Sequence, residues 1–280
     1  AAIPDAQESR GLGDVYKRQV GRFAVNRLRH YGVDIKYVKK ISGECRTSLA
    51  IYENVLDDFQ NVIYRNNAAD FQVQIEDVDK VEYGNFNAVI TAGTVFASDP
   101  SRSSTFHAIK NARQAGLPVI FDIDYRPYSW PSSEVASDVL SRAGMSSDLI
   151  VGNDEEFGFM AGDYDLGLDK ARELASLGKT VIYKMGDKGA ISLNDKNEIR
   201  TGIFPTKAIK PVGAGDSFMA GLLGVGGGII MVPALYYAFS VLDFDILTRM
   251  HLSVGTSLAI IIPTSIISTK THMELSLIHI

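Results

Sequence analysis

The sequence Gly213-Ala214-Gly215-Asp216-Ser217-Phe218 joins a glycine-rich turn to an apolar segment, residues 219–223, that can continue as a helix. Unsatisfied backbone N–H groups at the N-terminus of a helix attract anions, and small residues let a phosphate approach them. Asp216 would then stand beside the phosphate, where it could accept a proton from an attacking hydroxyl group. The alternative is an ordinary glycine turn in which Asp216 only complements the helix dipole. These six residues alone do not distinguish the two.

Upstream of this turn, strand and helix patterns alternate along the chain. Apolar strands are predicted at residues 88–92, 118–124, 148–152 and 180–184, with helices at residues 104–115, 133–143 and 168–177 between them. Regular β-α alternation with near-continuous apolar strands predicts an α/β fold, a three-layer sandwich in which helices cover both faces of a mostly parallel sheet. Ligands bind such sheets beyond the carboxyl ends of their strands.

The segment before this alternating part has a different pattern. A helix is predicted from Val20 to a glycine stop at Tyr31-Gly32. Two strand patterns follow at residues 45–53 and 61–66, joined by a polar turn. Together they predict a small β-flap, or lid, at about residues 45–70.

Polar residues gather where the predicted strands end. In chain order they are Asp122, Asp124 and Arg126, then Asn153 and Glu156, then Lys184 with the turn Gly186-Asp187-Lys188-Gly189. Asn153 and Glu156 also fit a helix N-cap with acidic residues in its first turn. Asp187 and Lys188 fit a plain turn equally well.

Three motifs in this order resemble those of the ribokinase-like (PfkB) carbohydrate kinases, over residues 20–222. They are Asn153-Asp154-Glu155-Glu156, in place of the family's Asn-x-x-Glu, then Lys184-Met185-Gly186-Asp187-Lys188-Gly189-Ala190, similar to its nucleotide-side Gly-x-x-Gly turn, and the Gly-Ala-Gly-Asp turn at 213–216. Three ordered motifs on the expected elements are more specific than one.

The resemblance implies a kinase that uses ATP and Mg²⁺. It implies that Asp216 takes the proton of a sugar hydroxyl group, while the backbone amides of Gly213, Ala214 and Gly215 hold the transferring phosphoryl group. By the same resemblance, Asn153 and Glu156 position Mg²⁺ and its waters. The nucleotide contacts that it implies are Lys184, Gly186 and Gly189.

Within the family, residues 45–50, 64–70 and 121–130 are most similar to the kinases of 5-dehydro-2-deoxygluconate in myo-inositol catabolism, and next to the 2-keto-3-deoxygluconate kinases. The chemistry independently favours an acidic sugar, because Arg65 and Arg126 offer planar forks for a carboxylate; Asp124 completes the substrate-binding set. The alternatives are that these arginines are surface residues, or that Arg126 pairs with a neighbouring Asp.

The expected reaction is the ATP-dependent phosphorylation of 5-dehydro-2-deoxy-D-gluconate to its 6-phosphate. Another sugar kinase activity of the family and a noncatalytic nucleotide-binding module are the alternatives. Two departures bear on the site. Lys210 and Pro211 stand where the family has Asp-Thr, so the role of that Asp is not carried over. Asp124 stands where many members have Asn, which replaces a donor-acceptor by an acceptor when the carboxyl is ionised. Trp130 is expected to pack at the domain edge.

The two ends of the chain encode one inverted DNA sequence. Residues 14–19 can be spelled GAT GTG TAT AAG AGA CAG, and the reverse complement, CTG TCT CTT ATA CAC ATC, encodes residues 275–280. This resembles the end of a transposase-based sequencing adapter. We therefore expect residues 1–19 and 275–280 to be foreign to the fold.

The chain carries no charged residue from Ser217 to Leu242. Such runs are transmembrane candidates or buried core helices. The glycine-rich segment 224–235, together with parts of residues 251–265, resembles the first repeat of the sulfite-exporter-like (TauE/SafE) permeases. We expect a chimera joined within residues 220–224, with a kinase fragment at 20–222 and a permease-like fragment at 223–274. A membrane anion permease fragment, residues 224–272, is the rival function.

Composition narrows the classes of function. The 280 residues are 46% apolar and 22% charged, with a net charge of −5 and one cysteine. These are values of a globular protein without a basic surface for nucleic acid, and one cysteine excludes an internal disulfide. We expect a cytoplasmic enzyme whose partners are a sugar acid and ATP, compatible with a homo-oligomer, and touching a membrane only through the C-terminal segment. Because the kinase part is truncated at both ends, we expect this chain to be inactive by itself.

Overall fold

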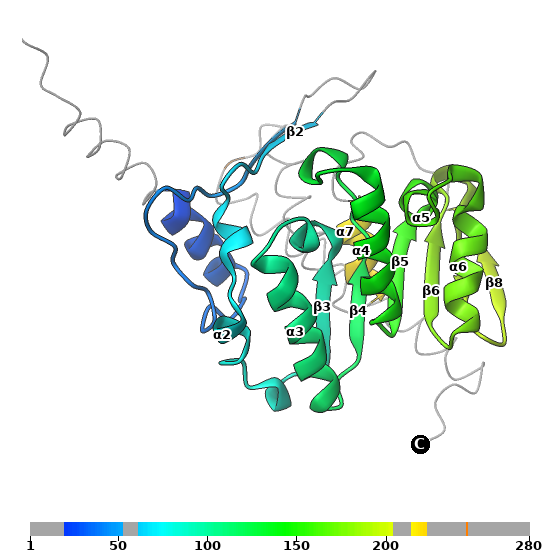
Figure 1. Cartoon of the computed structure of the whole chain (residues 1–280), viewed down its shortest axis with the longest axis horizontal. Coiled ribbons are helices and arrows are strands. Elements are labelled where there is room, and N and C mark those ends of the chain that lie inside the picture. The colour runs from blue at the N-terminus through cyan, green and yellow to red at the C-terminus, as the bar shows by residue number, and fades with distance from the viewer. Residues whose placement is uncertain (1–19, 53–60, 204–213, 223–244, 246–280) are drawn as a thin grey trace, which may run out of the picture. The chain divides into compact units, whose positions relative to one another are not determined.

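The structure, a computed structural model, describes residues 20–52, 61–203, 214–222 and Asp245 (Figure 1). The chain divides into two compact units, Ala1–Thr206 and Lys207–Ile280, and each is described by itself. The first unit contains the flap and the central sheet. The described part of the second consists of helix α7 (Ala214–Leu222) and Asp245.

The sheet of the first unit has six strands in sequential order, from β3 to β8. The parallel strands are β3 (Val89–Ala92), β4 (Val119–Asp122), β5 (Leu149–Asn153) and β6 (Thr180–Lys184). Strands β7 (Ala190–Leu193) and β8 (Glu198–Thr201) continue the sheet antiparallel. The expected α/β fold with a mostly parallel sheet is therefore confirmed.

Helices precede and connect the parallel strands. They are α2 (Ile75–Val78) before β3, then α3 (Ser101–Gln114), α4 (Ser133–Met145), α5 (Asp154–Ala161) and α6 (Gly167–Ser176). Right-handed crossovers between neighbouring parallel strands place their helices on one side, and α3, α4 and α6 lie over the same face of the sheet (Figure 1). Within the described part of this unit, the expected covering by helices is thus met on one face.

Short 3₁₀ turns complete the connections. They are η1 (Ala69–Gln72), η2 (Tyr83–Asn85), η3 (Gly93–Phe96), η4 (Pro127–Ser129), η5 (Tyr164–Leu166) and η6 (Gly186–Lys188). Three of them follow the carboxyl ends of parallel strands: η3 after β3, η4 after β4 and η6 after β6. They therefore lie at the edge where parallel sheets bind ligands.

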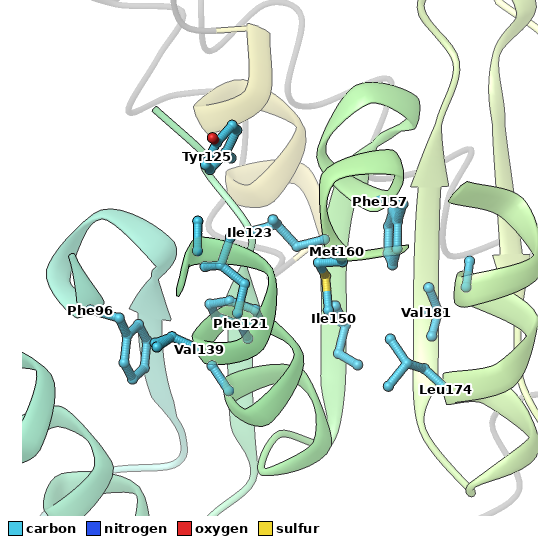
Figure 2. Close-up of a cluster of buried hydrophobic side chains, with 14 of the residues drawn as sticks. Phe96, Phe121, Ile123, Tyr125, Val139, Ile150, Phe157, Met160, Leu174 and Val181 are labelled. Atoms are coloured by element: carbon cyan, nitrogen blue, oxygen red, sulfur yellow. The ribbon is translucent and has the colours of Figure 1, made fainter. Parts of the chain in front are cut away.

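The core fills the space between the sheet and these helices. Phe121 of β4, Ile150 of β5 and Val181 of β6 are fully buried, and Leu140 of α4 and Leu174 of α6 cover them. Figure 2 shows the strand side chains Phe121, Ile150 and Val181 with the helix side chain Leu174 in one buried cluster. Burial of each such side chain contributes roughly 1.5–3 kcal/mol, so the apolar strand pattern accounts for the layered packing.

The flap consists of β1 (Leu49–Tyr52) and β2 (Asn61–Tyr64), paired antiparallel with Leu49 opposite Tyr64. Both strands fall inside the predicted flap and are shorter than the predicted ones. The first helix covers residues 20–30 and is followed by Gly32 with φ of 73°, as expected for a glycine stop.

Other element boundaries also moved. Helix α3 begins at Ser101, before the predicted residue 104, and the Asp99 carboxylate accepts a hydrogen bond from the Ser103 N–H (3.1 Å). Helix α5 was predicted only as the alternative reading of Asn153 and Glu156, and β8 was not predicted. None of the described helices is both long enough and apolar enough to cross a membrane.

Candidate functional site

Three parallel strands end in polar residues at the same edge of the sheet. Asp122 is the last residue of β4, Asn153 of β5 and Lys184 of β6. Asn153 and Lys184 are register partners on neighbouring strands. The parallel pairing therefore brings together residues that lie about thirty positions apart in the sequence, as the strand-end pattern predicted.

Asn153 and Glu156 begin helix α5 and form a reciprocal capping box. The Asn153 side chain accepts a hydrogen bond from the Glu156 N–H (2.7 Å), and the Glu156 carboxylate accepts one from the Asn153 N–H (2.8 Å). These two bonds satisfy donors that the helix start would otherwise leave unpaired. The local, structural interpretation of this motif is therefore confirmed, and a role in binding Mg²⁺ would be additional to it.

Glu156 is the one charged residue among the buried polar residues of the described chain, with 8% of its surface exposed. Burial raises the pKa of its carboxyl group, and the nearby Asp122 and Asp124 carboxylates raise it further, whereas the Asn153 N–H and the Lys184 ammonium lower it. The strand edge is thus a polar cluster in which carboxylates outnumber the one lysine that faces them. A titratable group shifted by burial beside charged neighbours is a common feature of functional sites.

The cluster does not by itself form a metal cage. Among the residues that the structure describes, no three His, Cys, Asp or Glu side chains are arranged to hold a metal ion together. Mg²⁺ usually keeps several waters and binds through one or two carboxylates and substrate phosphates. Glu156, with Asp122 and Asp124 near it, supplies donors of that kind.

Asp124 and Arg126 form an ion pair just beyond β4. The Arg126 guanidinium lies 2.6 Å from the Asp124 carboxylate and donates a second bond to the Tyr125 carbonyl oxygen (3.0 Å). Asp124 has φ of 34°, which Asp tolerates better than most side chains. The alternative in which Arg126 pairs with a neighbouring Asp is therefore confirmed. The pair leaves 39% of the Arg126 side chain exposed.

Arg65 follows β2 and is held from three sides. It forms an ion pair with Asp70, donates to the carbonyl oxygen of Thr94 (3.3 Å), and lies over the Phe71 ring, 4.3 Å from its centroid. Only 13% of its side chain is exposed. Arg65 is therefore an ordered, largely buried arginine and not a loose surface residue.

A pocket of about 390 Å³ lies beside Arg65 within the first unit. Its lining joins the flap to the residues after η3 and to the η4 region, through Ile63, Arg65, Asn66, Asn67, Phe71, Ala97, Ser98 and residues 128–131. The volume falls in the range of roughly 300–1,000 Å³ that is usual for small-molecule sites. Trp130, which was expected at the domain edge, is 8% exposed and packs with the core. Its indole N–H and the Ser129 hydroxyl are buried without a hydrogen-bond partner in the described structure.

The predicted nucleotide turn follows β6. Gly186 and Gly189 have φ of 56° and 88°, which glycine adopts without strain. A Cβ at Gly189 would lie 2.0 Å from the carbonyl oxygen of Thr201 in β8, so this glycine is also needed for packing. Lys184 is half-buried at the start of the turn, where it faces Glu156.

The residues of the opening motif lie in the second unit. Ala214, Gly215 and Asp216 form the first turn of α7, and Asp216 is exposed. A helix is therefore present, but it begins at Ala214, inside the segment that was expected to be a glycine-rich turn. Gly213, Lys210 and Pro211 lie outside the described residues, as do residues 1–19, most of residues 223–274, and residues 275–280.

Two residues of the site were not found by sequence reasoning. Asp70 pairs with Arg65, and Thr94 contacts both Arg65 and Asp124. Asp70 lay within a segment that carried the family resemblance, so a search for acids near Arg65 could have found it. Thr94 carried no signal, because its contacts come from elements far apart in the sequence.

Comparison with solved structures places the fold. Fructokinase from Vibrio cholerae O395, solved with fructose, ADP and calcium ion bound, superposes with a TM-score of 0.63 at 26% identity, covering 72% of this chain and 65% of that one. The PfkB protein from Polaromonas sp. JS666 superposes with a TM-score of 0.62 at 22% identity, covering 85% and 74%. The ribokinase-like architecture is therefore confirmed.

Two family sequence models match different parts of the chain. The sequence model described as sulfite exporter TauE/SafE matches residues 211–280. The model described as pfkB family carbohydrate kinase matches residues 9–225. The two matches overlap at residues 211–225, and the junction expected at residues 220–224 lies inside this overlap.

Curated relatives agree with the pfkB match. The 5-dehydro-2-deoxygluconokinases of Geobacillus kaustophilus and Photobacterium profundum are 34% and 32% identical to this chain over 218 and 225 residues. These alignments cover 76% and 78% of this chain, and 65% and 68% of the relatives. The chain thus spans about two thirds of the length of the relatives it matches. Over residues 9–225, the chain belongs to the pfkB family of carbohydrate kinases.

Proposed function

We propose that this chain carries a large part of a kinase that transfers the γ-phosphoryl group of ATP to a hydroxyl group of a sugar acid. The first candidate substrate is 5-dehydro-2-deoxy-D-gluconate, phosphorylated at its 6-hydroxyl in inositol catabolism, because relatives at 30–34% identity carry that name. The two ordered arginines, Arg65 and Arg126, suit a substrate carboxylate. A 2-keto-3-deoxygluconate kinase remains the alternative within the family.

The observation that carries this proposal is the position of Asp216. It lies in the first turn of α7, directly after Gly215 in the sequence, and its side chain is exposed. A carboxylate there can accept the proton of the substrate hydroxyl as that oxygen attacks the phosphoryl group. The backbone amides of Gly213, Ala214 and Gly215 would hold the developing negative charge, each worth on the order of 3 kcal/mol if well placed.

Within the first unit, we propose that the strand-end cluster binds Mg²⁺ and nucleotide. Bound Mg²⁺ neutralises phosphate charge during the transfer. Glu156 and Asn153 would hold its waters. The capping box already orients both side chains, because one Glu156 oxygen and the Asn153 amide oxygen each accept a backbone hydrogen bond. Lys184 and the backbone of Gly186 and Gly189 would contact the nucleotide.

The base assignment is tested by Asp216→Asn in a full-length gene recovered from the source DNA, assayed by ATP-dependent turnover of the sugar acid. We expect kcat to fall by about 10² to 10⁴, with little change in the midpoint of thermal unfolding because Asp216 is exposed. Asp169→Asn is the matched control, since Asp169 is also an exposed acid in a helix first turn. Near-normal turnover of the Asp216 variant would overturn the assignment.

The rival function is a membrane anion permease fragment, favoured by the TauE/SafE match to residues 211–280. We propose that residues 20–222 and 223–274 come from two different proteins, because two unrelated families meet at one short overlap. Fractionation of the expressed chain separates the two functions. A chain that enters the membrane fraction and binds no ATP would favour the permease.

A further inference from the structure

The two candidate substrate arginines are joined by one residue. Arg65 follows flap strand β2, and Arg126 lies beyond core strand β4. The Nη1 atom of Arg65 donates to the carbonyl oxygen of Thr94 (3.3 Å), and the Thr94 hydroxyl donates to the Asp124 carboxylate (3.3 Å). The other oxygen of that carboxylate lies 2.6 Å from Arg126. Thr94 thus connects the flap arginine to the sheet-edge ion pair.

Both ends of this connection are themselves fixed. Asp70, which pairs with Arg65, also accepts a hydrogen bond from the Ser48 hydroxyl (2.7 Å), and the Phe71 ring lies against the guanidinium. Arg126 is held by its bond to the Tyr125 carbonyl oxygen. Each arginine therefore has a defined orientation before any ligand arrives.

The position of Thr94 beside Asp124 depends on the neighbouring residue Gly93. A Cβ atom at Gly93 would lie 1.9 Å from the carbonyl oxygen of Ile123 and 2.8 Å from the Leu140 side chain. The backbone of η3 therefore packs directly on the chain that leaves β4, one residue before Asp124. Only a residue without a side chain permits that approach, and the approach is what brings the Thr94 hydroxyl to Asp124.

We propose that Thr94 is a positioning residue for the substrate carboxylate. It sets the spacing and orientation of Arg65 and Arg126, so that both forks can meet one carboxylate group of a sugar acid. This inference rests on the proposed function, because it takes the two arginines to be the groups that bind the acid. It adds a residue to which no catalytic or binding role has been assigned above.

The charges support a positioning role. Asp70 and Asp124 balance the two arginines, so the arrangement carries no large unpaired charge in the absence of substrate. A guanidinium has five donors, and an ion pair with one Asp leaves others for a ligand. Holding such groups in place beforehand lowers the entropic cost of binding. A neutral sugar lacks the carboxylate and should gain nothing from it.

The experiment compares Thr94→Val with Thr94→Ser in the 280-residue chain, by calorimetric titration with 5-dehydro-2-deoxygluconate and with 2-deoxyglucose. Valine keeps the shape and the backbone carbonyl and removes the hydroxyl donor, whereas serine keeps the donor. Thr105→Val is the matched control, because Thr105 is also half-buried and its hydroxyl donates within α3 to Ser101 (2.7 Å). The three variants are repeated in an Arg126→Ala background.

We expect Thr94→Val to weaken binding of the acid about tenfold, the scale of one hydrogen bond to a charged group. We expect the serine variant and the Thr105 control to stay within about twofold, and 2-deoxyglucose to show no difference among variants. In the Arg126→Ala background Thr94→Val should cost nothing further. Equal binding by the valine variant, an equal loss in the Thr105 control, or losses that multiply in the double variant would overturn the inference.

A second measurement needs no substrate and separates this inference from the proposed function. In ¹⁵N-arginine spectra, slow rotation of the Arg126 guanidinium should be lost in Thr94→Val and regained in Thr94→Ser. If the unmodified chain fails to bind the acid, these spectra alone judge the role of Thr94, and turnover by the full-length enzyme judges the proposed function. Slow rotation that persists in the valine variant overturns the positioning role of Thr94. Loss of slow rotation in the valine variant, with recovery in the serine variant, supports that role.

Discussion

Glu156 shows at the scale of a single residue how one side chain can serve a helix and a site together. Its carboxylate closes the capping box of α5, and it does so while 8% exposed and close to Asp122 and Asp124. A neutral amide would cap the helix equally well. The charge is therefore not needed for the cap, which is consistent with the proposed role near phosphate and Mg²⁺.

The stability of the fold should depend on pH through this residue. Burial raises the pKa of folded Glu156 above its ordinary value of 4.5, so the folded state holds the proton more tightly than the unfolded state. Stability then falls as pH rises from the ordinary pKa through the raised one, and the loss is complete above it. We expect Glu156→Gln to raise the thermal midpoint at pH 8, by about 2–4 °C per kcal/mol gained, and to lose this advantage near pH 4.

The control is Glu155→Gln, an exposed acid in the same helix turn, which should show no such pH-dependent gain. Thermal unfolding followed by circular dichroism from pH 4 to pH 8 measures both variants. A Glu156→Gln variant that is less stable than the unchanged chain at every pH would show that the charge itself holds the cap.

At the scale of elements, the turn η3 is where the flap, the sheet and helix α4 meet. Gly93 faces the Ile123 carbonyl oxygen and the Leu140 side chain of α4, and Thr94 bridges Arg65 and Asp124. The four residues of η3 therefore contribute both packing and hydrogen bonds. We expect a change in the backbone of η3 to affect both the stability of the fold and the geometry of the candidate site.

We expect Gly93→Ala to destabilise the fold, because its Cβ would stand 1.9 Å from the Ile123 carbonyl oxygen and the backbone would have to shift. Overpacking of this kind costs about 1–3 kcal/mol. The control is Gly84→Ala in η2, where an added Cβ meets nothing within 4 Å. Urea unfolding of both variants measures the difference, and equal midpoints would contradict the packing assigned to η3.

At the scale of the whole molecule, two families account for different parts of one chain. The pfkB match ends at residue 225 and the TauE/SafE match begins at residue 211. The first unit holds the flap, the strand-end cluster and the pocket beside Arg65, whereas Asp216 belongs to the second. The proposed catalytic base is thus encoded close to the change of family.

We expect long-read sequencing of the source DNA to find no molecule that reads through codons 211–225 as this chain does. The kinase sequence should continue beyond codon 222 into further kinase sequence, and the permease sequence should have its own upstream part. A single native reading frame that spans both halves would contradict the chimera. In that case Asp216 would have to act as the base in a protein whose native C-terminal part is the segment 223–274.

By itself the sequence determined the α/β class, the order of the parallel strands, the flap and the strand ends where polar residues gather. These follow from hydrophobic periodicity and from short motifs such as Asn153-x-x-Glu156, which are local properties of the chain. The tertiary structure alone decided that Arg126 pairs with Asp124, that Arg65 is buried on Phe71, and that Thr94 joins them. Those contacts depend on how closely separate elements approach, as at Gly93, and no local pattern specifies that distance.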